Sequence, residues 1–355
     1  MKLENFLKKR INNLQKRLKK EKIQYLLVTN SKNITYLTGY CPDGSSREVY
    51  LIFSEKKSYL FTFKLFEINV KNLHPLYKIT CLSKDNTLSS CIKRILDSDS
   101  IWIEKNDLKV SEFEDIKNKI NSKVHYSPKI IEELRQKKDD IEIVNLKKAC
   151  QITKKTWNQI KQSIRPGKTE KEIQSHIISV LYKNGADGIS VDFSPIVATG
   201  INSASPHHKP TNKKIKTNDV VLIDFGCQVS GYCSDMTRTL KLGEKSKEFD
   251  SIESIVKRAY EKAFLNLDNN ISTDERVFKI LEKHDLEKNM LHSTGHGIGL
   301  SVHESPAISR KSNEKIKIEN NMIFTIEPGI YLQNKFGYRY ENTIAKIKDE
   351  YVELT

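Results

Sequence analysis

Two short apolar segments that each end on a carboxylate place the strongest constraint on how this chain of 355 residues can fold. Residues 220–224 read Val-Val-Leu-Ile-Asp, and residues 322–327 read Met-Ile-Phe-Thr-Ile-Glu. Apolar runs of this length indicate buried strands. A carboxylate at the inner end of such a strand is costly to bury unless a positive group pairs with it. We therefore expect a cation at these two strand ends.

Each of these two carboxylates has a second one a short distance downstream. Asp235 follows Asp224 by eleven residues, after a turn at Gly231, and a hairpin of that length can return the second aspartate beside the first. Glu341 follows Glu327 by fourteen residues, on a segment that we expect to be a returning strand. Adjacent carboxylates repel each other, and a shared proton or a metal ion relieves that repulsion.

A histidine between glycines adds an imidazole to the four carboxylates. His296 is flanked by Gly295 and Gly297, where the backbone can approach closely. An oxygen-rich set with one imidazole favours Mn(II), Fe(II), Co(II) or Zn(II) over a metal that prefers thiolates. Four negative charges balance two divalent ions, and a pair about 3.5–4 Å apart can hold a bridging hydroxide as nucleophile. The predicted metal ligands are Asp224, Asp235, His296, Glu327 and Glu341.

Composition narrows the class of protein. The sequence contains no apolar run of about 18 residues, so we expect no membrane span. Its first residues run into a charged amphipathic pattern without the apolar core of a signal peptide, which predicts a cytoplasmic protein. Six cysteines without a CxxC pair argue against a disulfide framework. Cys227 and Cys233, which a hairpin could bring face to face, are expected to be buried thiols.

The formal net charge of +15 and the pI of about 9.3 raise the question of nucleic acid as a partner. Lysine outnumbers arginine several-fold, and the lysines are spread along the chain. Specific nucleic-acid surfaces rely on arginine forks and stacked aromatics, so the pattern disfavours this partner and indicates a solvated surface. A basic module for nucleic acid or the ribosome stays a separate interpretation, and it predicts steeply salt-dependent binding.

The length and the hydrophobic periodicity predict two domains, residues 1–132 and 133–355. The first is an α/β domain that opens with an amphipathic helix at 3–21, whose apolar stripe is expected to pack on a sheet. Strands are expected in this domain at 25–29, 49–53, 58–62 and 100–103.

The second domain is expected to begin with helices and to continue with strands. A charged run at 135–140 follows Pro128 and marks the boundary, and a long helical pattern starts at Asp140. A second helix over 169–183 opens with a Thr and a Glu spaced as in a capping box. Beyond Gly185 the chain reads as strands and turns rich in His, Asp and Gly.

Four motifs give the chain a resemblance to the metallopeptidases of pita-bread fold, peptidase family M24, which include methionine aminopeptidase, prolidase and Xaa-Pro aminopeptidase. A paired-aspartate hairpin spans 224–239, and a segment with Gly-His-Gly-Ile-Gly and Val-His-Glu spans 292–306. An Ile-Glu-Pro-Gly-Ile-Tyr strand spans 326–331. Residues 196–200 and 206–210 are similar to the family's first histidine segment. The resemblance covers nearly the whole chain.

The resemblance implies a creatinase/prolidase-like α/β domain followed by a pita-bread α+β domain with pseudo-twofold symmetry. By this resemblance Asp224 chelates one ion, and Asp235 and Glu341 bridge both. His296 and Glu327 then complete the shell of the other ion. The implied cofactor is two divalent metal ions, with Mn(II) favoured and Co, Zn or Fe as alternatives.

The resemblance also implies roles for residues around the metals. The residues implied in catalysis are His207, His292, His303 and Glu327. Imidazoles at such positions can donate to the developing oxyanion and relay a proton to the leaving amine, a step that Glu327 can share. Arg339, two residues before Glu341, is expected to brace a metal carboxylate. His208 is left without an assigned role.

The implied reaction is hydrolysis of an Xaa-Pro bond by a metal-bridging hydroxide, at the N-terminus of peptides as in aminopeptidase P or in dipeptides as in prolidase. The alternative is a non-peptidase relative, either a creatinase-like hydrolase or a binding module, although all five ligands are present. The leading domain argues against the bacterial form of methionine aminopeptidase. A homodimer is implied, but residues 62–66 depart from the relatives' Thr-Asp-x-Arg-Tyr stretch and put any substrate or dimer contact through it in question.

Overall fold

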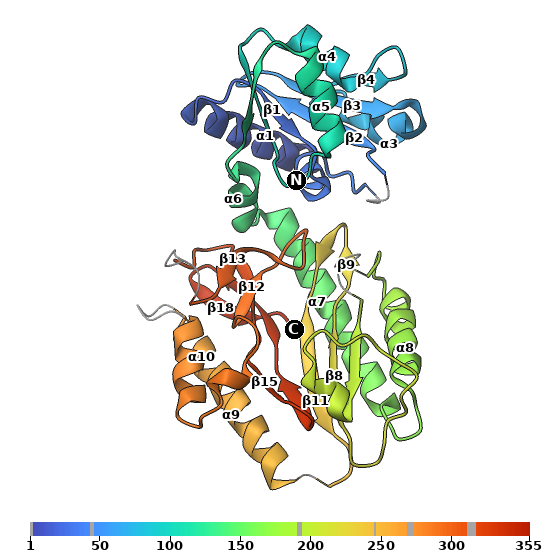
Figure 1. The fold of residues 1–355 in the computed structure, drawn as a ribbon, viewed down its shortest axis with the longest axis vertical. Helices are drawn as coiled ribbons and strands as arrows, with labels where there is room; N and C mark the ends of the chain where they lie inside the picture. Colours follow the sequence, from blue (N-terminus) through green and yellow to red (C-terminus); the bar gives the residue numbers. More distant parts are fainter. Residues whose placement is uncertain (1–2, 43–45, 190–193, 245, 268–272, 311–316) are drawn as a thin grey trace. The chain divides into compact units, whose positions relative to one another are not determined.

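Each of the two units that make up the chain has a sheet of its own. The computed structural model describes residues 3–42, 46–189, 194–244, 246–267, 273–310 and 317–355. The units are Met1–Arg135 and Gln136–Thr355, against the predicted division after residue 132. In Figure 1 the first unit runs from blue to blue-green and the second from green to red. Among the described helices, none combines the length and apolar character that a membrane span requires.

The N-terminal unit is built on a six-stranded sheet of order β4-β3-β2-β1-β5-β6. Strand β2 is antiparallel to both of its neighbours, whereas β1, β5 and β6 pair in parallel, as do β3 and β4. Helices α4 and α5 cover one face through a core that includes Leu27, Ile52, Ile92 and Ile116. The elements of this unit are α1 Leu3–Lys20, β1 Leu26–Val28, α2 Ser31–Thr38, β2 Val49–Phe53, β3 Ser58–Phe63, η1 Lys64–Phe66, α3 Glu67–Val70, η2 Lys71–Leu73, β4 Lys78–Leu82, α4 Leu88–Ile95, β5 Ser100–Ile103, α5 Val110–Lys119, β6 Lys123–Tyr126 and α6 Ile130–Gln136.

The predicted elements of this unit are confirmed where the sequence carries an apolar pattern. Helix α1 buries Leu7, Ile11, Leu14 and Leu18, and the strands expected at 25–29, 49–53, 58–62 and 100–103 are β1, β2, β3 and β5. Strands β4 and β6 were not predicted, because most of their side chains are exposed or half-buried and give no apolar run. The divergent stretch at 62–66 ends β3 and forms η1, with Leu65 exposed.

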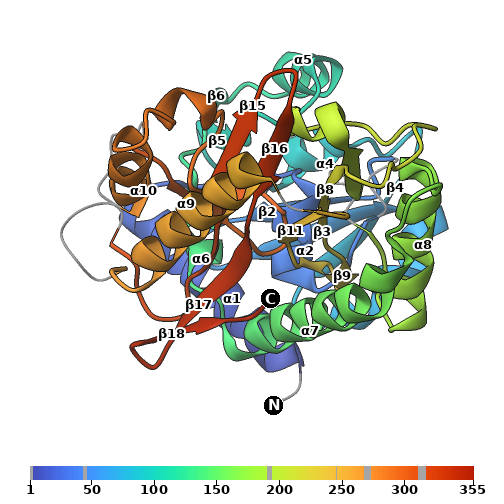
Figure 2. The same ribbon diagram turned by 90° about the horizontal axis from the view of Figure 1, so that it is seen from below.

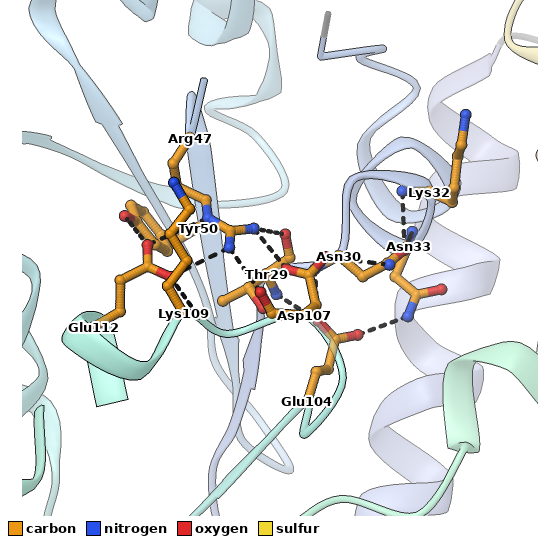
Figure 3. Close-up of polar contacts among 10 residues, drawn as sticks. All are labelled: Thr29, Asn30, Lys32, Asn33, Arg47, Tyr50, Glu104, Asp107, Lys109 and Glu112. Atoms are coloured by element: carbon orange, nitrogen blue, oxygen red, sulfur yellow. Dashed lines mark hydrogen bonds and ion pairs between the residues drawn. The ribbon is translucent and has the colours of Figure 1, made fainter. Parts of the chain in front are cut away.

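A half-buried carboxylate ties the end of β5 to the start of α2 (Figure 3). Glu104 directly follows β5, and its Oε2 accepts the backbone N–H of Thr29 at 2.5 Å and of Asn30 at 2.6 Å. Its Oε1 accepts the amide of Asn33 at 2.6 Å. Beside it, Arg47 donates to the Asp107 carboxylate at 2.6 Å. This network fixes the edge formed by the carboxyl ends of β1 and β5.

Replacing Glu104 with alanine is expected to destabilise the N-terminal unit by about 3 kcal/mol. The change leaves the two backbone donors without their acceptor and leaves the Asn33 amide only its bond to Glu132, and each lost bond costs about 1–3 kcal/mol before water or relaxation compensates. Urea unfolding of the full chain would measure the effect. Glu114→Ala, an exposed glutamate of α5, is the matched control. Equal stability of the two variants would contradict the assigned role of Glu104.

The C-terminal unit contains two helix pairs, and each covers its own sheet (Figure 2). Helices α7 and α8 pack on the three-stranded sheet β11-β8-β7. Helices α9 and α10 pack on β14 and β17 of the five-stranded sheet β13-β12-β14-β17-β18 and on the β15-β16 hairpin. The elements are α7 Asp140–Ile160, η3 Lys161–Ser163, α8 Glu170–Lys183, β7 Ile196–Thr199, η4 Gly200–Ala204, β8 Val220–Phe225, β9 Gln228–Val229, β10 Tyr232–Cys233, β11 Met236–Lys241, α9 Lys247–Phe264, α10 Thr273–Glu282, η5 Glu287–Asn289, β12 Gly295–Gly297, β13 Glu304–Ile308, β14 Ile323–Ile326, β15 Gly329–Leu332, β16 Phe336–Arg339, β17 Asn342–Ile347 and β18 Glu350–Glu353.

The two helices predicted for this unit are confirmed. Helix α7 begins at Asp140, and α8 has Thr169 as its N-cap with Glu172 completing the capping box. The cysteines Cys227 and Cys233 are buried thiols, as expected. Strand β11 also meets the second sheet, because the hydroxyl of Thr343 in β17 donates to the carbonyl just before β11 at 2.9 Å. The carboxylates predicted from the sequence lie along this line of contact.

Candidate metal centre

The first two carboxylates come from the antiparallel strands β8 and β11. Asp224 of β8 lies opposite Thr237 of β11, and Asp235 stands two residues before that threonine. Side chains alternate along a strand, so both aspartates lie on one face, and both are buried. Gly226 permits the close approach of the two strands, because a Cβ there would meet the Ser234 carbonyl oxygen at 1.8 Å. The chain makes the extra hairpin β9-β10 between the two strands and still returns Asp235 beside Asp224.

The other two carboxylates occupy the end of a second antiparallel pair. Ile326 of β14 pairs with Asn342 of β17, so Glu327 and Glu341 stand at the next positions outward. Glu341 is 1% exposed, and its Oε2 accepts the Thr237 hydroxyl at 2.7 Å. Its backbone N–H donates to the carbonyl of the same threonine at 3.3 Å. These bonds place the second pair of carboxylates next to the first.

The imidazole of His296 completes the group from β12. Its Nδ1 lies 3.1 Å from the Gly297 carbonyl oxygen, so Nδ1 carries the proton and Nε2 keeps its lone pair. Nε2 faces the carboxylates, 3.3 Å from Glu327 Oε1 and 3.8 Å from Asp235 Oδ2. The glycine is required here, because a Cβ at Gly297 would meet the Ser305 carbonyl oxygen at 2.3 Å.

The convergence leaves buried carboxylate oxygens without a hydrogen-bond donor among the described residues, an arrangement that favours a bound cation. One ligand atom each from Asp235, His296 and Glu341 lies within 4.8 Å of the others. Asp224 Oδ1, Asp235 Oδ1 and Glu341 Oε1 are buried and accept no hydrogen bond from any residue that the structure describes. Oxygen donors with one imidazole fit a hard or borderline divalent metal.

The electrostatics of four of these residues also favour a bound cation. Burial and the nearby charges of the other carboxylates raise the pKa of Asp235 and of Glu341 well above their ordinary values. Burial raises the pKa of Glu327 to about 8. Burial lowers the pKa of His296 to about 3, which keeps this imidazole neutral and able to bind a metal. Divalent ions would offset the repulsion among the carboxylates that contributes to the raised pKa values of Asp235 and Glu341.

Arg339 braces the centre from behind. Its guanidinium bonds the Asp224 carboxylate and donates to the Thr237 hydroxyl at 3.0 Å, so it holds one carboxylate directly and another through the threonine. It also donates to the Tyr331 hydroxyl at 2.6 Å and to the Pro206 carbonyl at 3.4 Å. The arginine is 3% exposed, and these bonds together with the nearby charges of Glu327 and Glu341 offset the cost of its burial.

The structure engages both ring nitrogens of His292. The Tyr331 hydroxyl accepts from Arg339, so it is left to donate to His292 Nε2, 2.7 Å away. Nδ1 therefore carries the proton and donates to the Ser293 carbonyl at 2.8 Å. Burial and the charge of Arg339 lower the pKa of His292 to about 4. The ring lies beside Glu327, with Nδ1 3.8 Å from Oε2, as a neutral group held in place from both sides.

The other two candidate histidines lie on the open side of the centre. The His303 ring is exposed, and its centroid lies 4.3 Å from that of His296. His207 is exposed on the loop after η4 and is near enough for its charge to lower the pKa of His292. Both can therefore meet a molecule that enters from solvent.

Sequence reasoning missed two members of the site and could not place a third residue. Tyr331 joins His292 to Arg339, and Thr237 joins the candidate ligand Glu341 to Arg339. Both residues lie inside the motifs named above, where a polar side chain in an apolar strand is the signal that could have identified them. His208, for which the sequence predicts no role, bonds the buried Glu170 at 2.9 Å.

Fold and site together define an enzyme class: a hydrolase with a buried centre of carboxylates and one imidazole for divalent metals. Residues 144–346 match the model of metallopeptidase family M24, and residues 10–137 match the creatinase/prolidase N-terminal domain. The chain belongs to metallopeptidase family M24. The fold predicted for it, an α/β domain followed by the family's catalytic domain, is confirmed.

Similar proteins of known name span the whole chain. A prolidase structure from Thermococcus sibiricus is 34% identical, with a TM-score of 0.90, covering 98% of this chain and 96% of that one. An X-Pro aminopeptidase structure from Thermotoga maritima is 30% identical, with a TM-score of 0.85 and 97% of each chain covered. The Xaa-Pro dipeptidase of Pyrococcus furiosus is 29% identical over 360 residues, covering 98% of both chains.

Proposed function

We propose that this protein is a dinuclear metallopeptidase that hydrolyses the bond between any residue and a following proline, in dipeptides or at the N-terminus of longer peptides. The observation that carries the proposal is the convergence of Asp235, His296 and Glu341, with buried carboxylate oxygens that lack a hydrogen-bond donor among the described residues. The names of the similar proteins support the Xaa-Pro specificity, and they include both dipeptidases and an aminopeptidase.

The proposed ligand arrangement uses all five predicted residues. Asp224 would hold one ion, and Asp235 and Glu341 would be shared between two. His296 and Glu327 would complete the second position, since His296 Nε2 and Glu327 Oε1 face each other. We propose Mn(II) as the metal, with Co, Zn or Fe as alternatives. Bound there, two divalent ions would polarise the scissile carbonyl and lower the pKa of water.

The protein's own groups then bind the substrate and move protons. His207 and His303, exposed beside the centre, are proposed to donate to the substrate carbonyl as its oxygen gains charge. Glu327 is proposed to carry a proton on a carboxylate oxygen to the departing nitrogen. His292 has both ring nitrogens engaged, so we propose that it orients Glu327, and that Arg339 and Tyr331 hold it there.

We also propose a catalytic domain, a cellular compartment and an oligomeric state for this protein. We propose residues 133–355 as the catalytic domain, because all of the candidate ligands fall in this range. All six cysteines are thiols in the structure, which fits the reducing cytoplasm that we propose for the enzyme. A homodimer is proposed from the family resemblance.

The test is cleavage of proline peptides by the Mn(II)-loaded protein. We expect hydrolysis of Gly-Pro, of an Xaa-Pro-Yaa tripeptide or of both, and no hydrolysis of the matching Gly-Ala and Xaa-Ala-Yaa peptides. Cleavage of the dipeptide alone identifies a prolidase, and cleavage of the tripeptide identifies an aminopeptidase P. If protein with two bound ions per chain cleaved neither proline peptide, or cleaved the alanine peptides equally well, the proposal would fail.

A further inference from the structure

A second buried carboxylate lies outside the metal centre, at the first residue of α8. Glu170 is 0% exposed, yet its carboxylate accepts every one of its side-chain bonds from outside its own helix. Oε1 accepts the Thr199 backbone N–H at 2.8 Å and the Asn202 amide at 2.9 Å. Oε2 accepts the backbone N–H of Thr211 at 2.9 Å and its hydroxyl at 2.7 Å.

The remaining bond to this carboxylate comes from His208. Its Nε2 lies 2.9 Å from Glu170 Oε2. Burial alone would raise the pKa of Glu170, but the bonds from His208 and Thr211 hold it below its ordinary value. An ionised carboxylate only accepts, so His208 Nε2 is the donor. Nε2 therefore carries a proton, and its 3.3 Å contact with the Asn202 amide nitrogen is not a hydrogen bond.

Helix capping does not explain this arrangement. Thr169 is the N-cap of α8, and its capping box is completed by Glu172, which is a different side chain. Two further charges belong to the same region: Lys213 donates to the Thr199 carbonyl at 2.7 Å, and Asp219 accepts the Thr199 hydroxyl at 2.9 Å. These bonds secure the end of β7, whereas the Glu170 carboxylate reaches forward to His208 and to Thr211, whose carbonyl also accepts the Lys171 backbone N–H at 3.1 Å.

The segment that Glu170 holds leads directly into the metal centre. The Pro206 carbonyl accepts from Arg339 at 3.4 Å, so this point of the loop is fixed to the arginine that braces Asp224. Two residues later His208 is fixed to Glu170. His207 lies between these two attachments, so its backbone is set on one side by the metal centre and on the other by the buried glutamate.

We propose that Glu170 and His208 are positioning residues of the peptidase reaction, which fix the loop so that His207 is presented to the substrate. The inference rests on the proposed function for the role of His207, and on the hydrogen bonds above for the positioning. The buried Glu170 carboxylate accepts bonds from five donor groups, and removing its charge weakens all of these bonds at once, so a small change at Glu170 is expected to release the loop.

The kinetic test is a double-mutant cycle between Glu170 and His207. Glu170→Gln replaces an anion that accepts from five donor groups with a neutral amide whose NH₂ cannot accept, and kcat/KM on the proline peptide is expected to fall about 10–100-fold. In a His207→Ala background the same change is expected to cost less than about 2-fold, because the histidine through which it acts is absent. Glu172→Gln, in the same helical turn, is the control and is expected to stay within about 2-fold of wild type.

Two substitutions of His208 distinguish the effect of its hydrogen bond to Glu170 from the effect of side-chain packing. His208→Gln keeps an N–H donor toward Glu170 and is expected to retain most of the activity, whereas His208→Leu is expected to match Glu170→Gln. Additive effects of Glu170→Gln and His207→Ala, or equal loss in His208→Gln and His208→Leu, would overturn the proposal. If Glu170→Gln fails to fold, the two His208 variants test the proposal in its place.

Hydrogen exchange tests the positioning without any turnover. With metal content unchanged, the amides of residues 199–211 are expected to exchange faster in Glu170→Gln and His208→Leu than in wild type, with Thr211 N–H the most affected. Unchanged exchange in this segment would overturn the inference. A wild-type protein that cleaves no proline peptide would instead overturn the proposed function, and the exchange result would still decide the positioning.

Discussion

Replacing Glu341 with glutamine is expected to abolish turnover and tight metal binding together. The side chain is 1% exposed, and its Oε1 is one of the buried oxygens without a donor in the described chain, so we assign its charge to the proposed metals. A glutamine can still accept the Thr237 hydroxyl, so the fold is expected to survive. Disturbing groups behind metal ligands already costs about 10–100-fold, and loss of a shared ligand is expected to cost about 10³-fold or more in kcat/KM.

The measurement pairs kinetics with metal stoichiometry. Glu341→Gln and Asp235→Asn should each bind fewer ions per chain than wild type by elemental analysis, and each should lose hydrolysis of the proline peptides. Glu319→Gln removes a carboxylate of the same unit that pairs only with the exposed Lys137, and it should behave as wild type. A Glu341 variant with two bound ions and more than about a tenth of the activity would show that this carboxylate is not a shared ligand.

The residues of this site that the sequence predicts are those that carry a local sequence signal. Asp224 and Glu327 stand out because each ends an apolar strand, and a period of two fixes which face each occupies. Asp235 and Glu341 follow on the returning strands, so adjacency in a hairpin predicts their approach. The same reasoning recovers the strands of the N-terminal sheet that are buried on both faces.

The parts that escaped prediction depend on contacts between distant segments. The family resemblance implies that Arg339 braces a metal carboxylate, but its partners in β8, β11, β15 and the loop after η4 come from distant segments, and no local pattern encodes all four. The state of His292 depends on Tyr331, which lies 39 residues away in the chain. Glu170 and His208 are separated by 38 residues, and each would pass alone for a surface residue. Contacts of this kind can be identified only in the three-dimensional structure.

The metal-free protein is expected to lose stability steeply as the pH rises from 6.5 to 8. The pKa of Glu327 is raised to about 8, and those of Asp235 and Glu341 are also raised. A carboxylate with a raised folded-state pKa contributes stability below its unfolded pKa, and this contribution is lost as the pH rises to the folded value. Each such group gives a slope of up to about 1.4 kcal/mol per pH unit.

The histidines also contribute to the pH dependence of stability, so they restrict the pH range in which the slope reports mainly on the carboxylates. The pKa of His292 is lowered to about 4 and that of His296 to about 3, so the unfolded chain binds more protons than the folded one below about pH 6.5. Their contribution rises with pH and opposes that of the carboxylates in that range. Above pH 6.5 this contribution fades as the unfolded imidazoles lose their protons, and the carboxylates increasingly set the slope.

Urea unfolding at pH 6.5, 7, 7.5 and 8, with chelator or with Mn(II), measures this dependence. The chain has two tryptophans, so Trp102→Phe leaves Trp157 of α7 as the reporter of the catalytic unit. Bound ions neutralise the ionised carboxylates, so the Mn(II)-loaded protein should show a flat profile, while Glu327→Gln should reduce the metal-free slope by up to about 1.4 kcal/mol per pH unit. A metal-free protein as stable at pH 8 as at 6.5 would mean that these carboxylates do not share one buried pocket, and the centre would have to be placed elsewhere.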